Sequence, residues 1–498
     1  MLFNSVQFII FFPIVLAVYF VIPEKLKNIW LLIASYFYYM CWNAKYIILI
    51  LASTLITYAS GLLIEKADAS SEDESVRKKR KDLVVAVSFI SNIGLLFVYK
   101  YLDLTCEVFN WITLHTGINF TVTPPHLLLP VGISFYTLQA LSYTMDVYRK
   151  ETYAEKNFIQ YALFVSFFPQ LVAGPIERSK NLLRQLSVHA RFSFENLREG
   201  TLLMLWGYFL KLVLADRIAL FVDTVYGDYT QYPGLYVPIA TMFFLIQVYC
   251  DFAGYSTIAI GAARILGISL MENFNAPFMS ASVAEFWRRW HISLTTWFRD
   301  YLYFPLGGSR KGKARKYINI MIIFVVSGLW HGASMTYVVW GALNGIFQVV
   351  GEILTPVKKA AAKVFNINTK KPGARLVGMI VTFLLLTFVS IFMRAATMAD
   401  AMQILKQIFT VGNPWIIFDG SLFECGLDKN GFLLLLAMIG VLAIADFCKY
   451  KGIAIRHIIL EQDRWFRCLF IALAILVIMT FGIYGPVYDS SAFVYFQF

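Results

Sequence analysis

The sequence predicts an all-α polytopic membrane protein, and three observations support this fold class. Of its 498 residues, 59% are hydrophobic and 15% are charged, whereas a soluble domain is about 45–50% apolar and about 25% charged. Apolar residues recur along the chain in blocks of about 17–25, the length that crosses roughly 30 Å of hydrocarbon. Aromatic residues make up 17% of the chain, and Trp and Tyr favour the two membrane interfaces.

The apolar blocks give the expected membrane segments in chain order. The first has no basic region and no small-residue cleavage site, so we expect a retained helix rather than a signal peptide. Block 158–175 contains Pro169, Gly174 and Pro175 and is flanked by basic residues, so we expect a re-entrant segment. The blocks lie at 6–22, 29–42, 46–64, 83–101, 127–145, 158–175, 199–222, 235–266, 317–351, 376–394, 431–447 and 467–485.

The net charge is +12, and most of the Lys and Arg lie between the blocks. In a membrane protein such clusters mark cytoplasmic loops, so nucleic acid is not an expected partner. Placing all clusters in the cytoplasm predicts an extracytoplasmic C-terminus. The six Cys residues form no C-x-x-C pair, so neither a disulfide framework nor a metal site is expected. The basic clusters are 76–82, 177–192, 286–317, 355–375 and 449–467.

Residues 317–351 contain His331 but no Asp, Glu, Lys, Arg or Pro. As one helix they would be about 50 Å long at 1.5 Å per residue, which is longer than a bilayer core. Basic clusters flank both ends, so we expect the segment to enter, bend near 328–332 and return. This bend would place His331 deep in the protein.

An ionisable residue inside a membrane segment is a candidate functional group. A buried imidazole is held in its neutral form by desolvation and can then remove a proton from a hydroxyl. The alternative is a structural histidine that bonds backbone carbonyls or water. Gly328 and Gly332 flank His331 and favour the functional interpretation, because glycine permits a bend or a close approach.

The segment 286–317 also contains a histidine, His291, among Trp, Tyr and Arg residues. It is too polar to cross lipid and too aromatic for a free loop. We expect helices in the cytoplasmic interface, with Arg288, Arg289 and Arg299 directed toward headgroups or phosphates. Interfacial anchoring alone would explain the arginines but not His291.

Two further features have a structural and a functional interpretation. Asp251 follows an uncharged stretch, and we expect it to orient a helix by pairing with Arg264 or Arg288. The C-terminal "FVYFQF" contains Tyr495. It could be a docking peptide or supply an acceptor hydroxyl, although an aromatic membrane anchor is the simpler interpretation from the residues alone.

Four ordered motifs resemble a known family. They are similar to those of the membrane-bound O-acyltransferase (MBOAT) family, and most similar to its bacterial branch of alginate and peptidoglycan O-acetyltransferase membrane subunits. The similarity runs in sequential order over about 160–350. The motifs are "SFFPQLVAGPIER", "IQVYCDFAGYSTIAIGAARILGI", "NFNAPFMSASVAEFWRRWHISLTTWFRDYLYFPLGG" and "FVVSGLWHGASMTYVVWGALNG".

The resemblance implies a ring of about 11–12 transmembrane helices, with re-entrant and interfacial helices, around a central funnel. It implies one domain over 1–498. Within it lie N-terminal helices (1–150), a catalytic core with His291 and His331 (158–352), C-terminal helices (353–485) and an extracytoplasmic aromatic tail (486–498). His331 matches the family's catalytic histidine and His291 its second site position, and Tyr495 becomes a candidate acyl relay.

The implied activity is transfer of an acetyl group from cytoplasmic acetyl-CoA across the membrane, for O-acetylation of an extracytoplasmic polysaccharide. His331 would act as the general base, and His291 would orient the donor or stabilise the oxyanion. Arg288, Arg289 and Arg299, with Arg310 and Lys311, would hold the donor phosphates. No bound cofactor or metal is expected.

The implied location is the bacterial cytoplasmic membrane. The expected partners are membrane lipid, the acyl donor (acetyl-CoA or an acyl-carrier protein) and an extracytoplasmic acetyltransferase or esterase-fold protein. Two alternatives stay open. The first is D-alanyl transfer to teichoic acid from a carrier protein. The second is a multi-pass transporter without chemistry, in which the intramembrane His and Asp would relay protons.

Overall fold

The computed structural model describes residues 1–118, 120–369 and 371–484, and every regular element within them is helical. This confirms the predicted all-α class. The tail 486–498, and with it Tyr495, lies outside the described residues.

Six helices among these residues are long and apolar enough to cross a membrane, which confirms a polytopic arrangement. A seventh span results if α16 (Met335–Ile353) and α17 (Thr355–Val364), which are bent by 47° at their junction, count as one. The total of 11–12 spans and their arrangement as a ring around a funnel stay predictions. The six candidate spans are Ala44–Asp68, Glu74–Lys100, Tyr236–Ile265, Pro372–Arg394, Lys429–Tyr450 and Arg464–Phe481.

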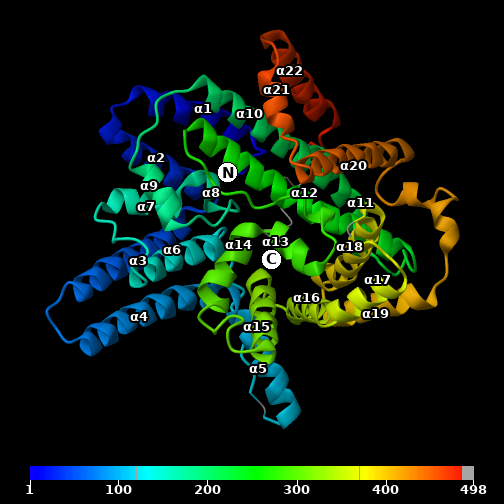
Figure 1. Ribbon diagram of the computed structural model, residues 1–498, viewed down its shortest axis with the longest axis horizontal. Coiled ribbons are helices and arrows are strands. Elements are labelled where there is room, and N and C mark those ends of the chain that lie inside the picture. Colours follow the sequence, from blue (N-terminus) through cyan, green and yellow to red (C-terminus); the bar gives the residue numbers. More distant parts are fainter. Residues whose placement is uncertain (119, 370, 485–498) are drawn as a thin grey trace. The chain divides into compact units, whose positions relative to one another are not determined.

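The chain divides into two compact units, of which the first comprises Met1–Thr201 and Ile258–Met271. In it α3, α4 and α6 run side by side (Figure 1). Block 158–175 forms two short helices, α7 and α8, so no single helix spans it, as its prolines and glycine predicted. The helices are α1 (Val6–Val21), α2 (Glu24–Met40), α3 (Ile47–Asp68), α4 (Glu74–Lys100), α5 (Leu102–Thr116), α6 (Ile133–Tyr148), α7 (Phe158–Ser166), α8 (Phe168–Leu171) and α9 (Ser179–Leu186).

The second unit comprises Leu202–Thr257 and the chain from Glu272 onward, and it contains both candidate histidines. Two helices, α10 (Phe194–Tyr208) and α12 (Tyr236–Ile265), continue from one unit into the other. The other helices of this unit are α11 (Asp216–Gly227), α13 (Val283–Arg289), α14 (Ile292–Phe298), α15 (Lys313–His331), α16 (Met335–Ile353), α17 (Thr355–Val364), α18 (Pro372–Arg394), α19 (Met398–Thr410), α20 (Lys429–Tyr450), α21 (Ile455–Glu461) and α22 (Arg464–Phe481).

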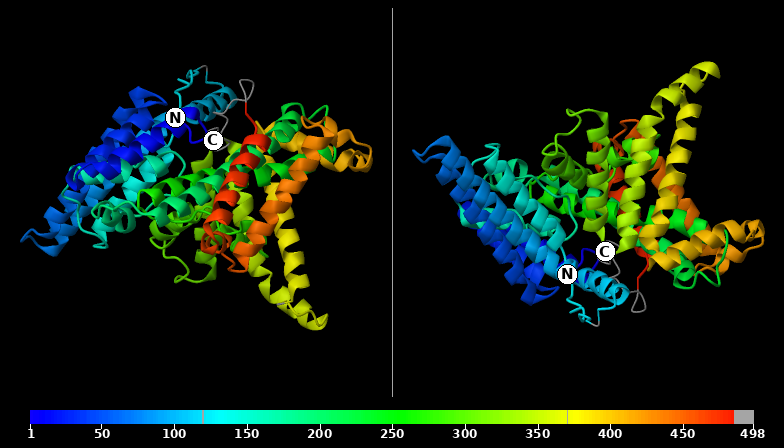
Figure 2. Two further views of the ribbon diagram at one scale, coloured as in Figure 1. Left: turned by 90° about the horizontal axis from the view of Figure 1, so that it is seen from above. Right: turned by 90° about the horizontal axis from the view of Figure 1, so that it is seen from below.

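Helix α17 and the first turns of α18 extend away from the other helices of the second unit (Figure 2). No residue of α17 is buried, and the buried residues of α18 begin only at Thr382. The C-terminal half of α18 packs against α16, with the Phe388 ring 6.5 Å from the Phe347 ring. This half of α18 therefore contributes to the interior of the unit, where α12, α13, α15 and α16 also supply buried side chains.

Candidate active site

The block 317–351 forms a helical hairpin. Helix α15 ends at His331 and α16 begins at Met335, so the predicted bend near 328–332 is confirmed. The side chain of Ser334 caps α16, and its Oγ accepts a hydrogen bond from the Thr336 N–H at 3.3 Å. Such a cap satisfies an amide that the first helical turn leaves unpaired. The turn therefore fixes His331 at the end of one helix, directly before the next.

Glycines allow the two helices of this hairpin to approach closely. A Cβ atom on Gly341 would lie 2.2 Å from the backbone oxygen of Phe324, and one on Gly328 would lie 2.3 Å from the oxygen of Tyr337. Both distances are far below van der Waals contact, and the opposing atoms are backbone atoms that cannot rotate away. The glycine pattern thus serves close helix packing, as it does in other membrane helix pairs.

We expect Gly341→Val to separate α15 from α16, to destabilise the protein by about 1–3 kcal/mol and to abolish activity by displacing His331. Gly351→Ala is the matched control on the same helix, because nothing lies within 4 Å of its added Cβ. Thermal unfolding in detergent and acyl transfer would be measured for both variants. Equal behaviour of the two would contradict the importance of the close approach.

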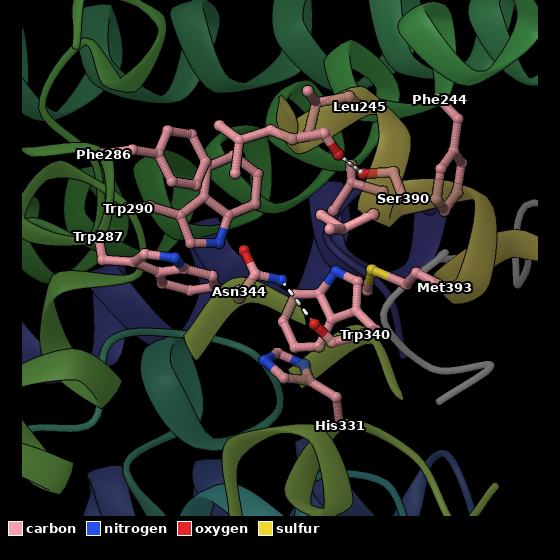
Figure 3. Close-up of a pocket in the computed structure, with 13 residues that line it drawn as sticks. Phe244, Leu245, Phe286, Trp287, Trp290, His331, Trp340, Asn344, Ser390 and Met393 are labelled. Carbon is pink, nitrogen blue, oxygen red and sulfur yellow. Dashed lines mark hydrogen bonds between the residues drawn. The ribbon is translucent and has the colours of Figure 1, made fainter. Parts of the chain in front are cut away.

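His331 is 4% exposed and lies among aromatic rings. The centroids of the Trp330 and Trp340 rings lie 4.9 and 5.1 Å from that of the imidazole, both at steep angles. The imidazole faces a cavity that receives side chains from α12, α13, α16 and α18 (Figure 3). The lining residues are Phe244, Leu245, Val248, Phe286, Trp287, Trp290, His331, Trp340, Asn344, Leu386, Val389, Ser390 and Met393.

His291 lies between α13 and α14 in a left-handed backbone conformation, with φ 42° and ψ 55°. This conformation is uncommon for a residue with a side chain. Asn273 holds the two residues after His291 in place. Its backbone oxygen accepts a hydrogen bond from the Ile292 N–H at 2.9 Å, and its Oδ1 accepts one from the Ser293 N–H at 3.3 Å. Its Nδ2 donates in turn to Ser256 Oγ on α12 at 3.0 Å. The strained position of His291 is therefore fixed by hydrogen bonds on its C-terminal side.

The fold brings His291 and His331 together. Their ring centroids are 6.5 Å apart, although the residues are 40 positions apart in sequence. His291 is 1% exposed, and the Phe252 ring packs edge-on against its imidazole at 4.6 Å. His291 is not among the residues that line the cavity. The two histidines therefore differ: the side chain of His331 lines the cavity, and that of His291 does not.

The three predicted donor-binding arginines do not line the cavity. Arg288 is exposed at the end of α13. The Nε of Arg289 donates to Glu285 Oε1 at 3.2 Å, and that of Arg299 donates to Asp300 Oδ1 at 2.9 Å. Arg288 and Arg299 are both exposed, whereas Arg299 already pairs with Asp300.

A network that sequence reasoning missed anchors α13, the helix that carries Arg288. Arg375 on α18 donates to Glu285 Oε1 at 2.7 Å and to the Met279 oxygen at 3.2 Å. Burial alone would raise the pKa of Glu285, but hydrogen bonding by Ala281 N–H and Arg375 holds it below its ordinary value. The guanidinium of Arg375 also lies over the Tyr450 ring, 4.9 Å from its centroid. The start of α18 and the end of α20 therefore fix α13.

The prediction that Asp251 pairs with Arg264 or Arg288 is wrong. Asp251 pairs with Lys211, whose Nζ lies 2.7 Å from Asp251 Oδ1 and 2.8 Å from Asp216 Oδ1. All three side chains are at most 3% exposed. Of the two expected partners, Arg264 instead pairs with Glu199 at 2.7 Å. Lys211 lies on a π-helical segment, Phe209–Ala215, inside an apolar block. A cation inside an apolar block indicates a buried ion pair, so the sequence did contain a signal for this cluster.

No group of three or more His, Cys, Asp or Glu side chains in residues 1–118, 120–369 and 371–484 is arranged to hold a metal ion. The groups at the cavity are one imidazole, one carboxamide, one hydroxyl and several indoles. This set suits proton transfer and hydrogen bonding to a neutral substrate.

Comparison with known protein families identifies the family of this chain. The sequence model of the membrane-bound O-acyltransferase family matches residues 31–390, which include both histidines and the whole cavity lining except Met393. The chain belongs to the membrane-bound O-acyltransferase family. The predicted resemblance is thereby confirmed, and the protein is an enzyme, an O-acyltransferase.

This O-acyltransferase is similar to several curated proteins. It is 36% identical to "Probable alginate O-acetylase AlgI" of Pseudomonas aeruginosa, over 83% of this chain and 75% of that protein. It is 32% identical to "Peptidoglycan O-acetyltransferase" of Helicobacter pylori, over 82% and 79% of the two chains. The "Teichoic acid D-alanyltransferase" of Bacillus subtilis is 28% identical over 45% of this chain and 60% of its own length. The likeness to O-acetylating proteins thus covers more of the chain.

Proposed function

We propose that this O-acyltransferase moves an acetyl group from a cytoplasmic thioester to a hydroxyl on the extracytoplasmic side, for O-acetylation of a cell-envelope or secreted polysaccharide. The observation that carries the proposal is the position of His331. It is 4% exposed, at the turn of a tightly packed hairpin, and faces a cavity within the part of the chain that the family matches. The names of the O-acetylating relatives support acetyl as the acyl group.

The proposed reaction is a direct acyl transfer. The hydroxyl oxygen attacks the thioester carbonyl carbon, the new C–O bond forms and the C–S bond breaks. His331 accepts the hydroxyl proton and returns it to the leaving thiolate, so an O-acetyl ester and a free thiol are the products. The buried ring of His291, 6.5 Å from that of His331, would support the site without lining the cavity. Only the acetyl group would cross the membrane, while the charged donor would stay on the cytoplasmic side.

The donor proposed is acetyl-CoA, with Arg288 as a ligand of its phosphates. Arg288→Ala should raise the KM for acetyl-CoA several-fold, because a charge-assisted hydrogen bond to phosphate is lost. The KM for S-acetyl-N-acetylcysteamine, which has the thioester but no phosphate, should not change. Thiol release measured with both donors tests this. An equal effect on the two donors would contradict a phosphate contact.

The acceptor is a sugar hydroxyl or a protein hydroxyl that relays the acetyl group to an extracytoplasmic acetyltransferase. The sequence offers Tyr495 for such a relay. Mass spectrometry of the C-terminal peptide during turnover would detect an acetyl adduct, and full activity of Tyr495→Phe would exclude the relay.

The proposed function is tested with purified protein in proteoliposomes that receive acetyl-CoA or a D-alanyl carrier protein as donor and alginate or peptidoglycan fragments as acceptor. We expect thiol release and ester formation with acetyl-CoA. Turnover with the D-alanyl carrier alone would favour the D-alanyl alternative. Movement of a substrate across the bilayer without ester formation would favour a transporter.

A further inference from the structure

Two buried polar atoms at the His331 cavity have no hydrogen-bond partner in the part of the chain that the structure describes. They are the indole nitrogen Nε1 of Trp287 and the carboxamide oxygen Oδ1 of Asn344. Trp287 is 8% exposed and Asn344 is fully buried, and both line the same cavity as His331. Buried polar atoms are nearly always paired, so two at one cavity require an explanation.

The orientation of the Asn344 carboxamide is determined by its neighbour. Its Nδ2 donates to the backbone oxygen of Trp340 at 2.8 Å. Because a carbonyl oxygen can only accept, the nitrogen must face Trp340 and the oxygen Oδ1 must face elsewhere. In the view of Figure 3 the carboxamide lies beside the Trp287 indole and above the His331 imidazole. The lining of this cavity therefore includes one acceptor, Asn344 Oδ1, and one donor, Trp287 Nε1.

A ligand that pairs with both Trp287 Nε1 and Asn344 Oδ1 must offer one hydrogen-bond acceptor and one donor. An indole N–H can only donate a hydrogen bond, and the free carboxamide oxygen can only accept one. A thioester on a pantetheine arm offers the reverse: a carbonyl oxygen that accepts and, two methylenes beyond the sulfur, an amide N–H that donates. The Ser390 hydroxyl, which also lines the cavity, already donates to the Leu386 oxygen at 2.8 Å.

We propose that Trp287 and Asn344 bind the reactive end of the pantetheine arm. The Trp287 N–H donates to the acyl carbonyl oxygen, and Asn344 Oδ1 accepts from the nearest pantetheine amide. This assignment rests on the proposed function of the cavity. As His331 removes the proton of the attacking hydroxyl, negative charge develops on the carbonyl oxygen, and the Trp287 N–H becomes the donor that stabilises it. His291, which lies outside the cavity lining, is then not needed for that role.

The contact of Asn344 is tested with two small donors that differ only at the amide. S-acetyl-N-acetylcysteamine has the amide N–H, whereas S-acetyl-O-acetyl-mercaptoethanol has an ester oxygen in its place. We expect the wild type to prefer the amide by about tenfold in kcat/KM, the equivalent of one hydrogen bond. In Asn344→Leu the preference should fall to about one. The control Ser390→Ala, which removes a cavity hydroxyl that is already paired, should keep the wild-type preference.

The contact of Trp287 is tested by turnover and by infrared spectroscopy. Trp287→Phe should lower kcat by roughly 10²–10³-fold, the loss seen when one oxyanion donor is removed, with little change in KM. In the wild type, bound acetyl-CoA with a ¹³C carbonyl should show a carbonyl band at or below its frequency in water. This measurement needs no variant. A band shifted upward, as in an apolar solvent, would overturn the assignment of Trp287.

The outcomes separate this inference from the proposed function. If His331→Ala loses activity while Asn344→Leu keeps the tenfold preference, the pantetheine contact is wrong and the proposed function stands. If His331→Ala keeps its activity, the proposed function itself fails. Acetyl-CoA and an acetylated carrier protein share the pantetheine arm, so running both donors in parallel shows which one supplies it. Turnover of neither would overturn both proposals.

Discussion

Replacing His331 by alanine is expected to lower the rate of acyl transfer by about 10²–10⁴-fold, the contribution of a general base in proton transfer. The imidazole is the only histidine side chain that lines the cavity in the described residues. The neighbouring Trp330 and Trp340 rings should keep their positions without it. Transfer of ¹⁴C-acetyl from acetyl-CoA to polysaccharide by purified protein in proteoliposomes measures the effect.

The matched control is His457→Ala. His457 is an exposed histidine on α21, so its removal tests for any general effect of losing an imidazole. We expect it to transfer acetyl at the wild-type rate. Both variants should elute from size-exclusion chromatography as the wild type does. A folded His331→Ala variant with unchanged transfer would refute the role of His331 as the base.

Replacing Lys211 by methionine is expected to destabilise the protein by about 3–5 kcal/mol, which is the cost of leaving a buried charge without its partner. Lys211 lies between Asp216 and Asp251, at 2.8 and 2.7 Å, and its removal would leave two carboxylates in an apolar interior. Because Asp251 directly precedes Phe252, which packs against His291, activity should fall as well. Thermal unfolding followed by fluorescence-detected size exclusion measures the loss.

Two comparisons show whether the loss comes from unpaired charge. Lys316→Met removes the partner of Glu352 in a partly exposed ion pair, and such pairs contribute about 0–1 kcal/mol. The triple variant Lys211→Met, Asp216→Asn and Asp251→Asn removes all three charges and should recover much of the stability. If Lys211→Met were as stable as Lys316→Met, the cluster would have no structural role.

The sequence alone predicted the bend in the segment that carries His331, because the thickness of a bilayer limits the length of a single membrane helix. Residues 317–351 are too long for one span, and the glycines near 328–332 allow a bend. The structure has the turn there, directly after His331. The proximity of His291 and His331 was not derivable from spacing, since it depends on how α12 and α16 pack around the short helices α13 and α14. Only the family resemblance suggested it.

Other features depend on contacts that a linear sequence does not specify. Lys211 was counted as part of the apolar block 199–222, and its pairing with Asp251 follows from the packing of its π-helical segment against α12. Asn344 is a polar residue in an apolar run, but its free oxygen becomes evident only once the bond of its nitrogen to Trp340 is known. Pairing and orientation of buried polar groups therefore required coordinates.

Two helices outside the apolar blocks, α5 and α17, were missed for a different reason. Helices α5 and α17 have mixed composition and expose most of their apolar side chains, including Trp111 and Val357. The block criterion requires continuous hydrophobicity, so it cannot detect amphipathic helices of this kind. It also began α4 at residue 83, whereas the helix starts at Glu74 and includes the basic cluster 76–82.

The most direct test of the central claim, that acyl transfer takes place in the His331 cavity, is a cryo-EM structure of the protein with S-acetonyl-CoA. In this unreactive analogue, a methylene group separates the sulfur from a ketone carbonyl, so no acyl C–S bond can be cleaved. The account predicts that the carbonyl oxygen lies within hydrogen-bond distance of Trp287 Nε1, in the cavity lined by His331 and Asn344. An analogue bound with its carbonyl outside that cavity, while the protein is active with acetyl-CoA, would contradict it.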